Sequence, residues 1–576
     1  MGALFSRVRL IYQTLKSISD SFSALSKRIS RDPGLPTPAP SRSYWCLPHS
    51  PLDNLETSSL PADADVVIIG SGIAGAAIAR TLLDSSSGGK KRPLRIAMLE
   101  ARDICSGATG RNGGHISPNS YQDYSELASK YGVEAAQAMI RFRLAHLPAL
   151  LAVAEEEGLL PESQARMVDQ FDIYLRETLF QRAKNSLAAY FEALPERREK
   201  HDIRDAKAKI EDLQLSPLAT GCISQSGGAL HPYRLITGIL ARLLNVYPAF
   251  QLFTHTPCTD IALAADGRSY CIITPKGTLT TAHVIHATNA WAAHLLPGMR
   301  RKIVPMRVHM TAQRPGSALG VETADALPWT GTRAFVFYPG TTMFAFDYLT
   351  QQPNGDGLDA DNSAKLGSDV SADTGYPAPA GELMFGGGAM LGGRAEAVLL
   401  DNIGIADDSG TDFEVTAYLG GALERYFAPG WGEESSTSSS RAARTAGGSV
   451  SPSGDDGWGA GRIKAAWTGI MGLSADGQPW VGRVPRYASQ RAEPGEPPTP
   501  EANLSLARPG EWIAAGFSGE GMTHAWLAGV ALARMVLVDV SVKGKDASAL
   551  PPQFLITEKR LKEADIEAFL GEVGSE

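Results

Sequence analysis

The 576-residue sequence has few cysteines, no long apolar run and no excess of positive charge. Its five cysteines are scattered, so we expect free thiols in a reducing compartment and neither a disulfide framework nor a metal site. No stretch of 18 uncharged apolar residues is present, so no transmembrane helix is expected. The 54 basic residues are outnumbered by 62 acidic ones, a net charge of −8, so no general attraction to nucleic acid is expected.

Apolar residues nevertheless make up 43% of the chain, enough for a large core. The length corresponds to roughly two to four domains. Three stretches rich in glycine, serine, proline or aspartate, at 351–380, 432–460 and 487–510, are predicted as surface insertions.

Residues 1–32 differ from the rest because they hold six basic and only two acidic residues. Apolar residues recur at alternating steps of four and three, which predicts a one-sided amphipathic helix: Leu4, Val8, Ile11, Leu15, Ile18, Phe22, Leu25 and Ile29. Its apolar stripe can be covered by the protein's own body, an anionic membrane surface or a partner helix. A mitochondrial presequence and N-myristoylation at Gly2 are further alternatives. We expect a retained helix on an otherwise soluble, cytoplasmic protein, with mitochondrial or peripheral membrane location as the alternatives.

A buried-strand run at 64–69 leads directly into a glycine-rich turn and then into a helical run at 76–83. The turn, Gly70-Ser71-Gly72-Ile73-Ala74-Gly75, is the G-x-G-x-x-G pattern in its required context. We expect Gly70 to make the tight turn, Gly72 to let a pyrophosphate approach the backbone, and Gly75 to bring the helix close to the sheet. The N–H groups at the start of the helix then face the phosphates.

The second strand of this unit, 94–99, ends at Glu100. A carboxylate there can accept hydrogen bonds from a ribose diol and repels a 2′-phosphate. Three more segments suit the same cofactor: the loop 106–115 with its four glycines, the strand end at 284–291, and the glycine-rich turn 516–522 before a helical run. Only one dinucleotide motif is present, which argues against an NAD-dependent dehydrogenase.

These motifs resemble those of the D-amino-acid-oxidase-like FAD-dependent oxidoreductases. The resemblance also includes Gly228-Ala229-Leu230-His231-Pro232, Pro305-Met306-Arg307 and the run from Trp467 to Gly482. Within that family the sequence looks most like the γ-glutamylputrescine oxidoreductase branch, and fungal relatives in particular. The resemblance runs from about Asp65 to Val538. It implies an α/β fold in which a Rossmann-like FAD-binding domain interleaves with a substrate domain built on a mixed β-sheet. FAD is expected to be noncovalent, because Gly469 stands where some relatives carry a tethering cysteine.

The motifs and the resemblance together predict a set of residues that bind FAD. They are Gly70, Ser71, Gly72, Ile73, Ala74, Gly75, Glu100, Ala101, Arg102, Ser106, Gly107, Ala108, Thr109, Arg111, Asn112, Gly113, Gly114, Cys258, Ala287, Thr288, Asn289, Trp291, Asp476, Gly516, Gly519, Glu520, Gly521 and Met522.

The resemblance implies an enzyme that oxidises a C–N bond of an amine or amino-acid-type small molecule by hydride transfer to flavin N5. The polar groups expected near the flavin are His115, Glu520 and Thr523. His115 is a candidate base for an incoming ammonium, or a histidine satisfied by a backbone carbonyl. Glu520 is a second candidate, or a capping carboxylate at a helix start. The electron acceptor stays open between oxygen and another carrier, and an assembly or scaffolding flavoprotein is the alternative function.

The predicted organisation follows from these assignments. It comprises an amphipathic helix at 1–32, an arm or linker at 33–60, a discontinuous FAD domain at 61–125, 220–300 and 461–540, a substrate domain at 126–219 and 301–431, the low-complexity insertion at 432–460, and a C-terminal tail at 541–576.

Overall fold

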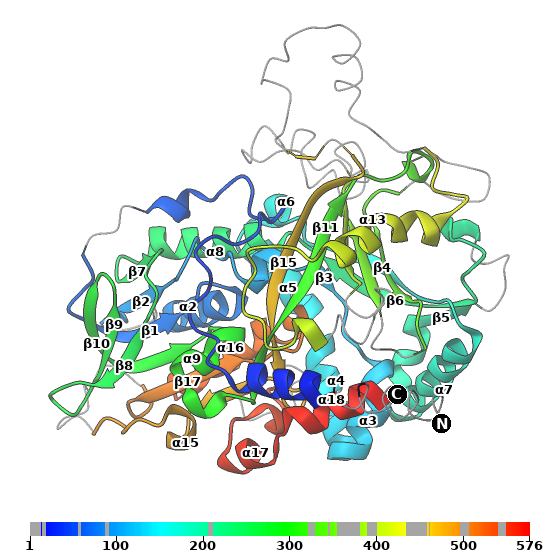
Figure 1. Cartoon of the computed structure of the whole chain (residues 1–576). Helices are drawn as coiled ribbons and strands as arrows, with labels where there is room; N and C mark the ends of the chain where they lie inside the picture. The colour runs from blue at the N-terminus through cyan, green and yellow to red at the C-terminus, as the bar shows by residue number, and fades with distance from the viewer. Residues whose placement is uncertain are drawn as a thin grey trace, which may run out of the picture.

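The structure is a computed structural model of the chain. It describes residues 13, 16, 19–55, 59–86, 92–204, 211–320, 329–341, 343, 346–353, 381–388, 400–433, 458–459, 461–495, 506–538 and 549–575. Two β-sheets lie side by side, the first at the left of Figure 1 and the second at the upper right, and helices pack around both. This arrangement confirms the predicted mixed α/β class.

In the described part of the chain the first sheet has eight strands, five of which run parallel to one another. The strands in spatial order are β16 (Trp480–Arg483), β17 (Gly510–Ala515), β10 (Gly277–His286), β1 (Asp63–Ile69), β2 (Ile96–Leu99) and β7 (Phe250–Phe253), with β9 (Tyr270–Thr274) beside β10 and β8 (Asp260–Leu263) beside β9.

The register of this sheet brings three sequence motifs to one edge. Ile69, the last residue of β1, pairs with Leu99 of β2 and with His286 of β10. Gly70, Glu100 and Ala287 therefore follow three neighbouring strands at the same level. Ligands of open parallel sheets bind at this carboxyl edge.

Two helices from opposite ends of the sequence pack together against this sheet. They are α2 (Ile73–Ser86), which follows the glycine-rich turn, and α16 (Ala525–Val536). A Cβ atom on Gly529 of α16 would lie 2.8 Å from the Ala74 carbonyl oxygen, so only glycine permits this approach. The amino-terminal turns of both helices consequently face the same space.

The second sheet has nine strands in the described residues and is mixed, since β4 and β12 are parallel and the other pairs are antiparallel. In spatial order they are β15 (Ile463–Ser474), β11 (Ile303–Gln313), β14 (Leu383–Gly387), β13 (Asp347–Gln351), β12 (Arg333–Tyr338), β4 (Arg166–Tyr174), β6 (Gly221–Ala229) and β3 (His115–Ile116), with β5 (His201–Arg204) beside β6.

The remaining helices surround these sheets (Figure 1). They are α3 (Tyr121–Tyr131), α4 (Val133–Leu144), α5 (His146–Glu156), α6 (Leu160–Ser163), α7 (Glu177–Ala193), α8 (Pro232–Val246), α9 (Ala292–Leu295), α13 (Phe413–Phe427), α15 (Arg486–Ser489), α17 (Glu558–Glu563) and α18 (Ile566–Ser575). None of the helices in the described residues has the length and apolarity that crossing a membrane requires.

Strand pairing differs from the predicted domain ranges at three places. β3, β6 and β15 fall within the ranges predicted for the FAD domain, but all three pair in the second sheet. β15 is the clearest example, because it pairs with β11 along almost its whole length. The chain thus crosses between the two sheets more often than the motifs indicate.

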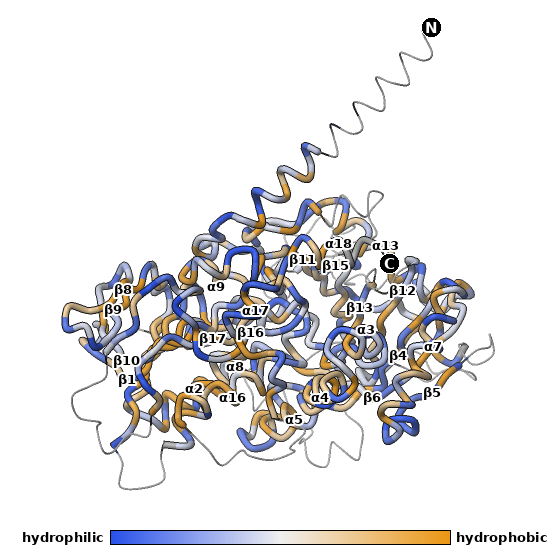
Figure 2. The backbone as a smooth tube through the Cα atoms, turned by 90° about the horizontal axis from the view of Figure 1, so that it is seen from below, coloured by the Kyte–Doolittle hydropathy of each residue, from blue (hydrophilic) through white to orange (hydrophobic). Residues whose placement is uncertain are grey.

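The amino-terminal helix contacts the protein's own body. Residues 19–30 are helical, and Leu25 and Ile29 are buried in a core cluster, whereas Phe22 is 57% exposed. Figure 2 shows this helix leaving the body near α18. Asp32 then forms an ion pair with Arg300 (2.8 Å), and its Oδ1 lies within hydrogen-bonding distance of His294 Nδ1 (3.0 Å). The stripe positions from Leu4 to Ile18 lie outside the described residues.

Three other predictions of peripheral segments need correction where residues are described. Residues 549–575 of the predicted tail contain α17 and α18, and Arg560 forms a two-point ion pair with Asp476 (2.7 and 2.9 Å). In the predicted insertion 487–510, Arg491 pairs with the buried Glu511 at 2.6 Å. The first residues of the insertion 351–380 are buried at the end of β13. Residues 354–380, 434–457 and 496–505 lie outside the described residues.

Candidate active site

A cavity of about 710 Å³ lies between the two sheets. One wall is made by the carboxyl edge of the first sheet, including Ile69, Leu99 and Ala287. The opposite wall comes from α3, α4, β12 and β13 and includes Arg143 and Tyr348. The cavity is of the size that small-molecule and cofactor sites have in proteins. We call these surfaces the cofactor wall and the substrate wall.

The glycine-rich turn has the geometry that the motif predicts. Gly70 has a φ of +108°, and a Cβ atom there would lie 2.6 Å from the Ala287 carbonyl oxygen. A Cβ atom on Gly72 would lie 3.1 Å from Thr109 Oγ1. The same Thr109 oxygen accepts a hydrogen bond from the Ile73 N–H at 3.0 Å. The turn therefore has space for backbone and little space for side chains.

Glu100 lines the cavity, but its carboxylate also organises the turn itself. Oε2 accepts hydrogen bonds from the Ser71 N–H (3.1 Å) and the Ser71 hydroxyl (2.7 Å). Oε1 accepts one from the Arg102 N–H at 3.0 Å. Each carboxylate oxygen has further lone-pair capacity, so a ribose can share this carboxylate with the protein donors.

Arg102 and Arg111 line the cavity, yet their guanidinium groups bind within the protein. Arg102 Nη1 lies 2.9 Å from Asp408 Oδ1, and Arg111 Nε lies 3.5 Å from Asp408 Oδ2. Asp408 is fully buried. The prediction that both residues bind FAD does not anticipate this pairing, because the sequence places Asp408 about 300 positions away.

Three distant segments meet on the cofactor wall, as the motifs indicate. Asn289 Oδ1 accepts a hydrogen bond from the Gly516 N–H at 3.0 Å, and the Ser518 N–H donates to the Gly472 carbonyl at 2.9 Å. Asp476 lines the cavity as predicted, but its carboxylate is held by Arg560. Burial raises the pKa of Asp476, and the hydrogen bonds and charge of Arg560 outweigh this effect and lower the pKa overall.

Most of the predicted cofactor residues line this one cavity. Gly75, Ser106, Gly114 and Gly516 are the exceptions and do not line it. Several buried polar atoms at the cavity have no hydrogen-bond partner among the described protein atoms: Thr288 Oγ1, Trp291 Nε1, His115 Nε2 and Glu520 Oε2. Such orphaned groups and two helix starts facing the cavity suit a large polar, anionic ligand, so the residues present fit FAD.

His115 lies on the cavity as predicted, but its environment does not favour a base at neutral pH. Its ring stacks on Tyr348 with centroids 6.4 Å apart. Burial lowers the pKa of His115 to about 4, so the imidazole is neutral at pH 7. A neutral imidazole whose Nε2 has no hydrogen-bond partner can form a hydrogen bond to a ligand but carries no charge.

Glu520 stands just before α16, and its side chain is 22% exposed. Asn119 Nδ2 donates to Oε1 at 2.9 Å, and Oε2 lies 3.7 Å from Arg143 Nε. Burial raises the pKa of Glu520 to about 7, although the charge of Arg143 acts in the opposite direction. A carboxyl group that titrates near neutral pH is suited to proton transfer. Thr523, the third predicted catalytic residue, donates its hydroxyl hydrogen bond to the Glu520 carbonyl at 3.1 Å and so supports the turn.

The sequence motifs miss Arg143 and Asn119, both of which line the cavity. The Arg143 guanidinium is buried and donates to Asp123 Oδ2 at 2.6 Å and to the Asn119 carbonyl at 2.8 Å. On α4 it occupies the same buried face as Met139 and Ile140. A charged residue on the buried face of a helix is the signal that could have found it, because such residues are rarely buried without a purpose.

The dinucleotide turn, the two sheets and the cavity between them are typical of a flavoprotein oxidoreductase with a cofactor sheet and a substrate sheet. The family described as DAO, FAD dependent oxidoreductase, matches residues 65–535, and the chain belongs to this family. FAD is accordingly its cofactor, and the resemblance seen in the motifs is confirmed.

Among curated proteins, the chain is similar to the gamma-glutamylputrescine oxidoreductase of Escherichia coli strain K12. The two are 24% identical over 264 residues, which is 45% of this chain and 56% of that protein. The chain thus matches little more than half the length of this relative. The fungal assignment stays a prediction.

Two solved structures share the fold. Glycine oxidase from Geobacillus kaustophilus has a TM-score of 0.55 at 16% identity and covers 86% of this chain and 99% of its own. L-proline dehydrogenase from P. horikoshii has a TM-score of 0.52 at 16% identity and covers 83% and 94%.

Proposed function

We propose that the protein oxidises the C–N bond of an amine or amino-acid-type small molecule. Membership of the FAD-dependent family and the likeness to a gamma-glutamylputrescine oxidoreductase support this function. The observation that carries the proposal is Glu520, a half-buried carboxylate on the cavity whose Oε2 has no hydrogen-bond partner among the described residues and whose pKa is near 7. Bound FAD supplies the acceptor, at N5, for a hydride from the carbon next to nitrogen.

Glu520 is proposed to take a proton from the substrate ammonium. An amine must lose this proton before its nitrogen lone pair can assist departure of a hydride. Asn119 holds Oε1, which leaves Oε2 as the atom that accepts the proton. Arg143 lies beside this oxygen and stabilises the ionised form of Glu520 that is ready to accept.

His115 is proposed to orient the substrate rather than to take its proton. Because its pKa of about 4 keeps the ring neutral, Nε2 can form one hydrogen bond to a substrate group. Stacking against Tyr348 fixes the plane of the ring. The proposal thus assigns proton transfer to the carboxylate and positioning to the imidazole.

Anaerobic mixing of the purified flavoprotein with an amine and amino-acid panel tests the function. γ-Glutamylputrescine, glycine and L-proline belong in the panel because the similar proteins are named for them. We expect at least one compound to bleach the flavin, and deuterium on the carbon next to nitrogen to slow bleaching severalfold. A flavin that no amine reduces would overturn the proposal and favour the scaffolding alternative, which no observation here supports.

The electron acceptor and the cellular location each need an experiment of their own. Readmitting air after bleaching distinguishes oxygen from another carrier, because only an oxidase is reoxidised rapidly. Burial of Leu25 and Ile29 favours the protein's own body as the surface that covers the second half of the amino-terminal helix. Flotation of the full chain with anionic vesicles tests the alternative of membrane contact.

A further inference from the structure

Residues 33–55 precede the part of the chain that matches the family, which starts at residue 65. We call them the N-terminal arm. They run along residues 102–114, which we call the cofactor loop. The only regular structure in this loop is the four-residue 3-10 turn Ala108–Arg111, so its conformation depends on contacts with other segments.

The first part of the arm binds the two loop arginines. Arg102 Nη1 donates to the Thr37 carbonyl at 3.3 Å, and Arg111 Nη1 donates to Ser41 Oγ at 3.3 Å. The Ser41 N–H donates to the carbonyl of Asp408, whose carboxylate pairs with the same arginines. The arm and Asp408 thus enclose both guanidinium groups.

The middle of the arm binds backbone carbonyls of the loop. The Ser43 hydroxyl donates to the Gly110 carbonyl at 2.7 Å, and the indole N–H of the fully buried Trp45 donates to the Asn112 carbonyl. A Cβ atom on Gly110 would lie 2.8 Å from Cys46 Sγ, so arm and loop are in direct contact.

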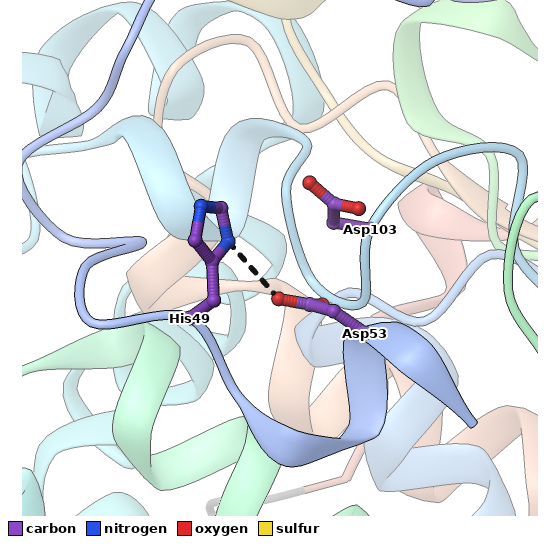
Figure 3. A group of neighbouring side chains, drawn as sticks. All are labelled: His49, Asp53 and Asp103. Carbon is purple, nitrogen blue, oxygen red and sulfur yellow. Dashed lines mark hydrogen bonds and ion pairs between the residues drawn. The ribbon is translucent and has the colours of Figure 1, made fainter.

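The last part of the arm holds the start of the loop. Asp53 Oδ1 accepts a hydrogen bond from the Ile104 N–H at 2.9 Å. Asp53 Oδ2 lies 3.2 Å from His49 Nδ1, and Asp103 stands beside this pair, as Figure 3 shows. Asp53 is buried, so this backbone contact is shielded from water.

The opposite side of the cofactor loop faces the cavity. Residues 107–109 and 111–113 line it, and Thr109 caps the first N–H of α2. Asn112 folds back on the loop, because its side chain accepts from the Gly114 N–H at 2.7 Å and donates to the Ala108 carbonyl at 3.3 Å. The loop therefore lies between the arm and the cofactor site.

We propose that the N-terminal arm is a positioning element for FAD, which holds the cofactor loop in its binding conformation so that FAD affinity depends on it. Ordering the loop in advance lowers the entropic cost of binding. The inference rests on FAD as cofactor and is independent of which substrate is oxidised. It assigns a role to a segment outside the family domain.

The test is a double variant of the full chain, Ser43→Ala with Trp45→Phe. It removes two arm-to-loop hydrogen bonds and keeps an aromatic ring in the core. Apoprotein is titrated with FAD while flavin fluorescence is followed, and FAD release is timed after dilution. We expect about tenfold weaker binding and faster release, given the usual strength of two hydrogen bonds. The Tm of the FAD-loaded protein should fall more than the Tm of the apoprotein.

Tyr426→Phe is the matched control. It removes a hydrogen bond of the same length as that of Ser43, 2.7 Å, from a buried tyrosine to Asp347 in the second sheet, and Tyr426 does not line the cavity. Its Kd for FAD should equal that of the wild type, while both Tm values fall together.

Single Ser43→Ala and Trp45→Phe variants, each with a severalfold effect, replace the double variant if it does not fold. Wild-type FAD affinity in the arm variants, or equal weakening in Tyr426→Phe, would overturn the proposal. Flavin bleaching by amines is not needed for any of these measurements.

Discussion

The two walls of the cavity are built in different ways. The cofactor wall and the loop beside it consist of short, glycine-containing stretches, such as residues 69–74, 107–109 and 111–113. The substrate wall consists of side chains that α3, α4, β12 and β13 bring together from distant parts of the chain. A cofactor common to a whole family can be held by backbone that many sequences share, whereas a substrate is distinguished by individual side chains.

The walls also differ in their titrating groups. Around the substrate wall, burial sets the pKa of His115 to about 4, that of Glu520 to about 7 and that of Asp172 to about 6. Asp172 accepts a hydrogen bond from Gln122, which lines the cavity. On the cofactor wall, Arg102, Arg111 and Asp476 instead meet opposite charges. Groups that titrate near neutral pH thus lie beside the substrate wall, and groups of fixed charge lie on the cofactor wall.

The largest expected effect is on the cofactor wall. Gly72→Val places a branched side chain against Thr109 Oγ1, which lies 3.1 Å from an added Cβ, and fills the approach to the turn. We expect loss of FAD from the purified protein, measured by absorbance. Gly421→Ala, where an added Cβ has no atom within 4 Å, should keep its flavin. A yellow Gly72→Val protein would contradict the assignment of this turn.

A second effect concerns Glu520, which precedes α16 and contacts the substrate wall at Arg143. Glu520→Gln should slow flavin reduction by about a hundredfold, the usual contribution of a general base, with little change in FAD content. In the wild type the rate should rise with pH through about 7, because ionised Glu520 is the competent form. Stopped-flow reduction at several pH values checks this. Persistence of the same pH dependence in Glu520→Gln would assign it to another group.

A smaller effect is expected at Glu100. Glu100→Ala removes the acceptor of the Ser71 and Arg102 donors and of the expected ribose. Loss of charged hydrogen bonds should weaken FAD binding by roughly 1.5–3 kcal/mol, about ten- to a hundredfold. Equilibrium titration of the apoprotein with FAD measures the change in affinity. As a control, the flavin that stays bound should be reduced by substrate at the wild-type rate. Unchanged affinity would remove Glu100 from the cofactor wall.

The smallest effect should come from residues 434–457, which lie outside the described residues. Their polar, Ser-rich composition is typical of a stretch that contributes no core. Replacing them by a short Gly/Ser linker should leave FAD content, Tm and reduction rate unchanged. The replacement keeps Glu433, whose carbonyl binds Ser317, and Trp458, whose ring lies under Arg42. Loss of flavin on replacement would show that this stretch supports a wall.

The candidate site was predictable from sequence wherever neighbouring residues act together. The turn from Gly70 to Gly75 and the loop at 106–115 can be recognised in the sequence, because each stretch makes its own turn and is expected to face one ligand. Glu520 could be found because two glycines flank it before a helix. Arg143 and Asn119 could not be found in this way, since their role arises from packing against Glu520 about 400 positions away.

The sequence by itself determined the strand–turn–helix unit, the cofactor class and the edge of the sheet where we expect the cofactor, because these follow from local backbone sterics and hydrogen-bond donors. Only the tertiary structure decided which charges are neutralised, as with Asp408 between Arg102 and Arg111, and which titrate, as with Glu520 and His115. It also turned residues 33–55 from a predicted arm or linker into a support of the cofactor loop. Burial and long-range pairing set these properties, and both depend on groups that folding brings together from distant parts of the chain.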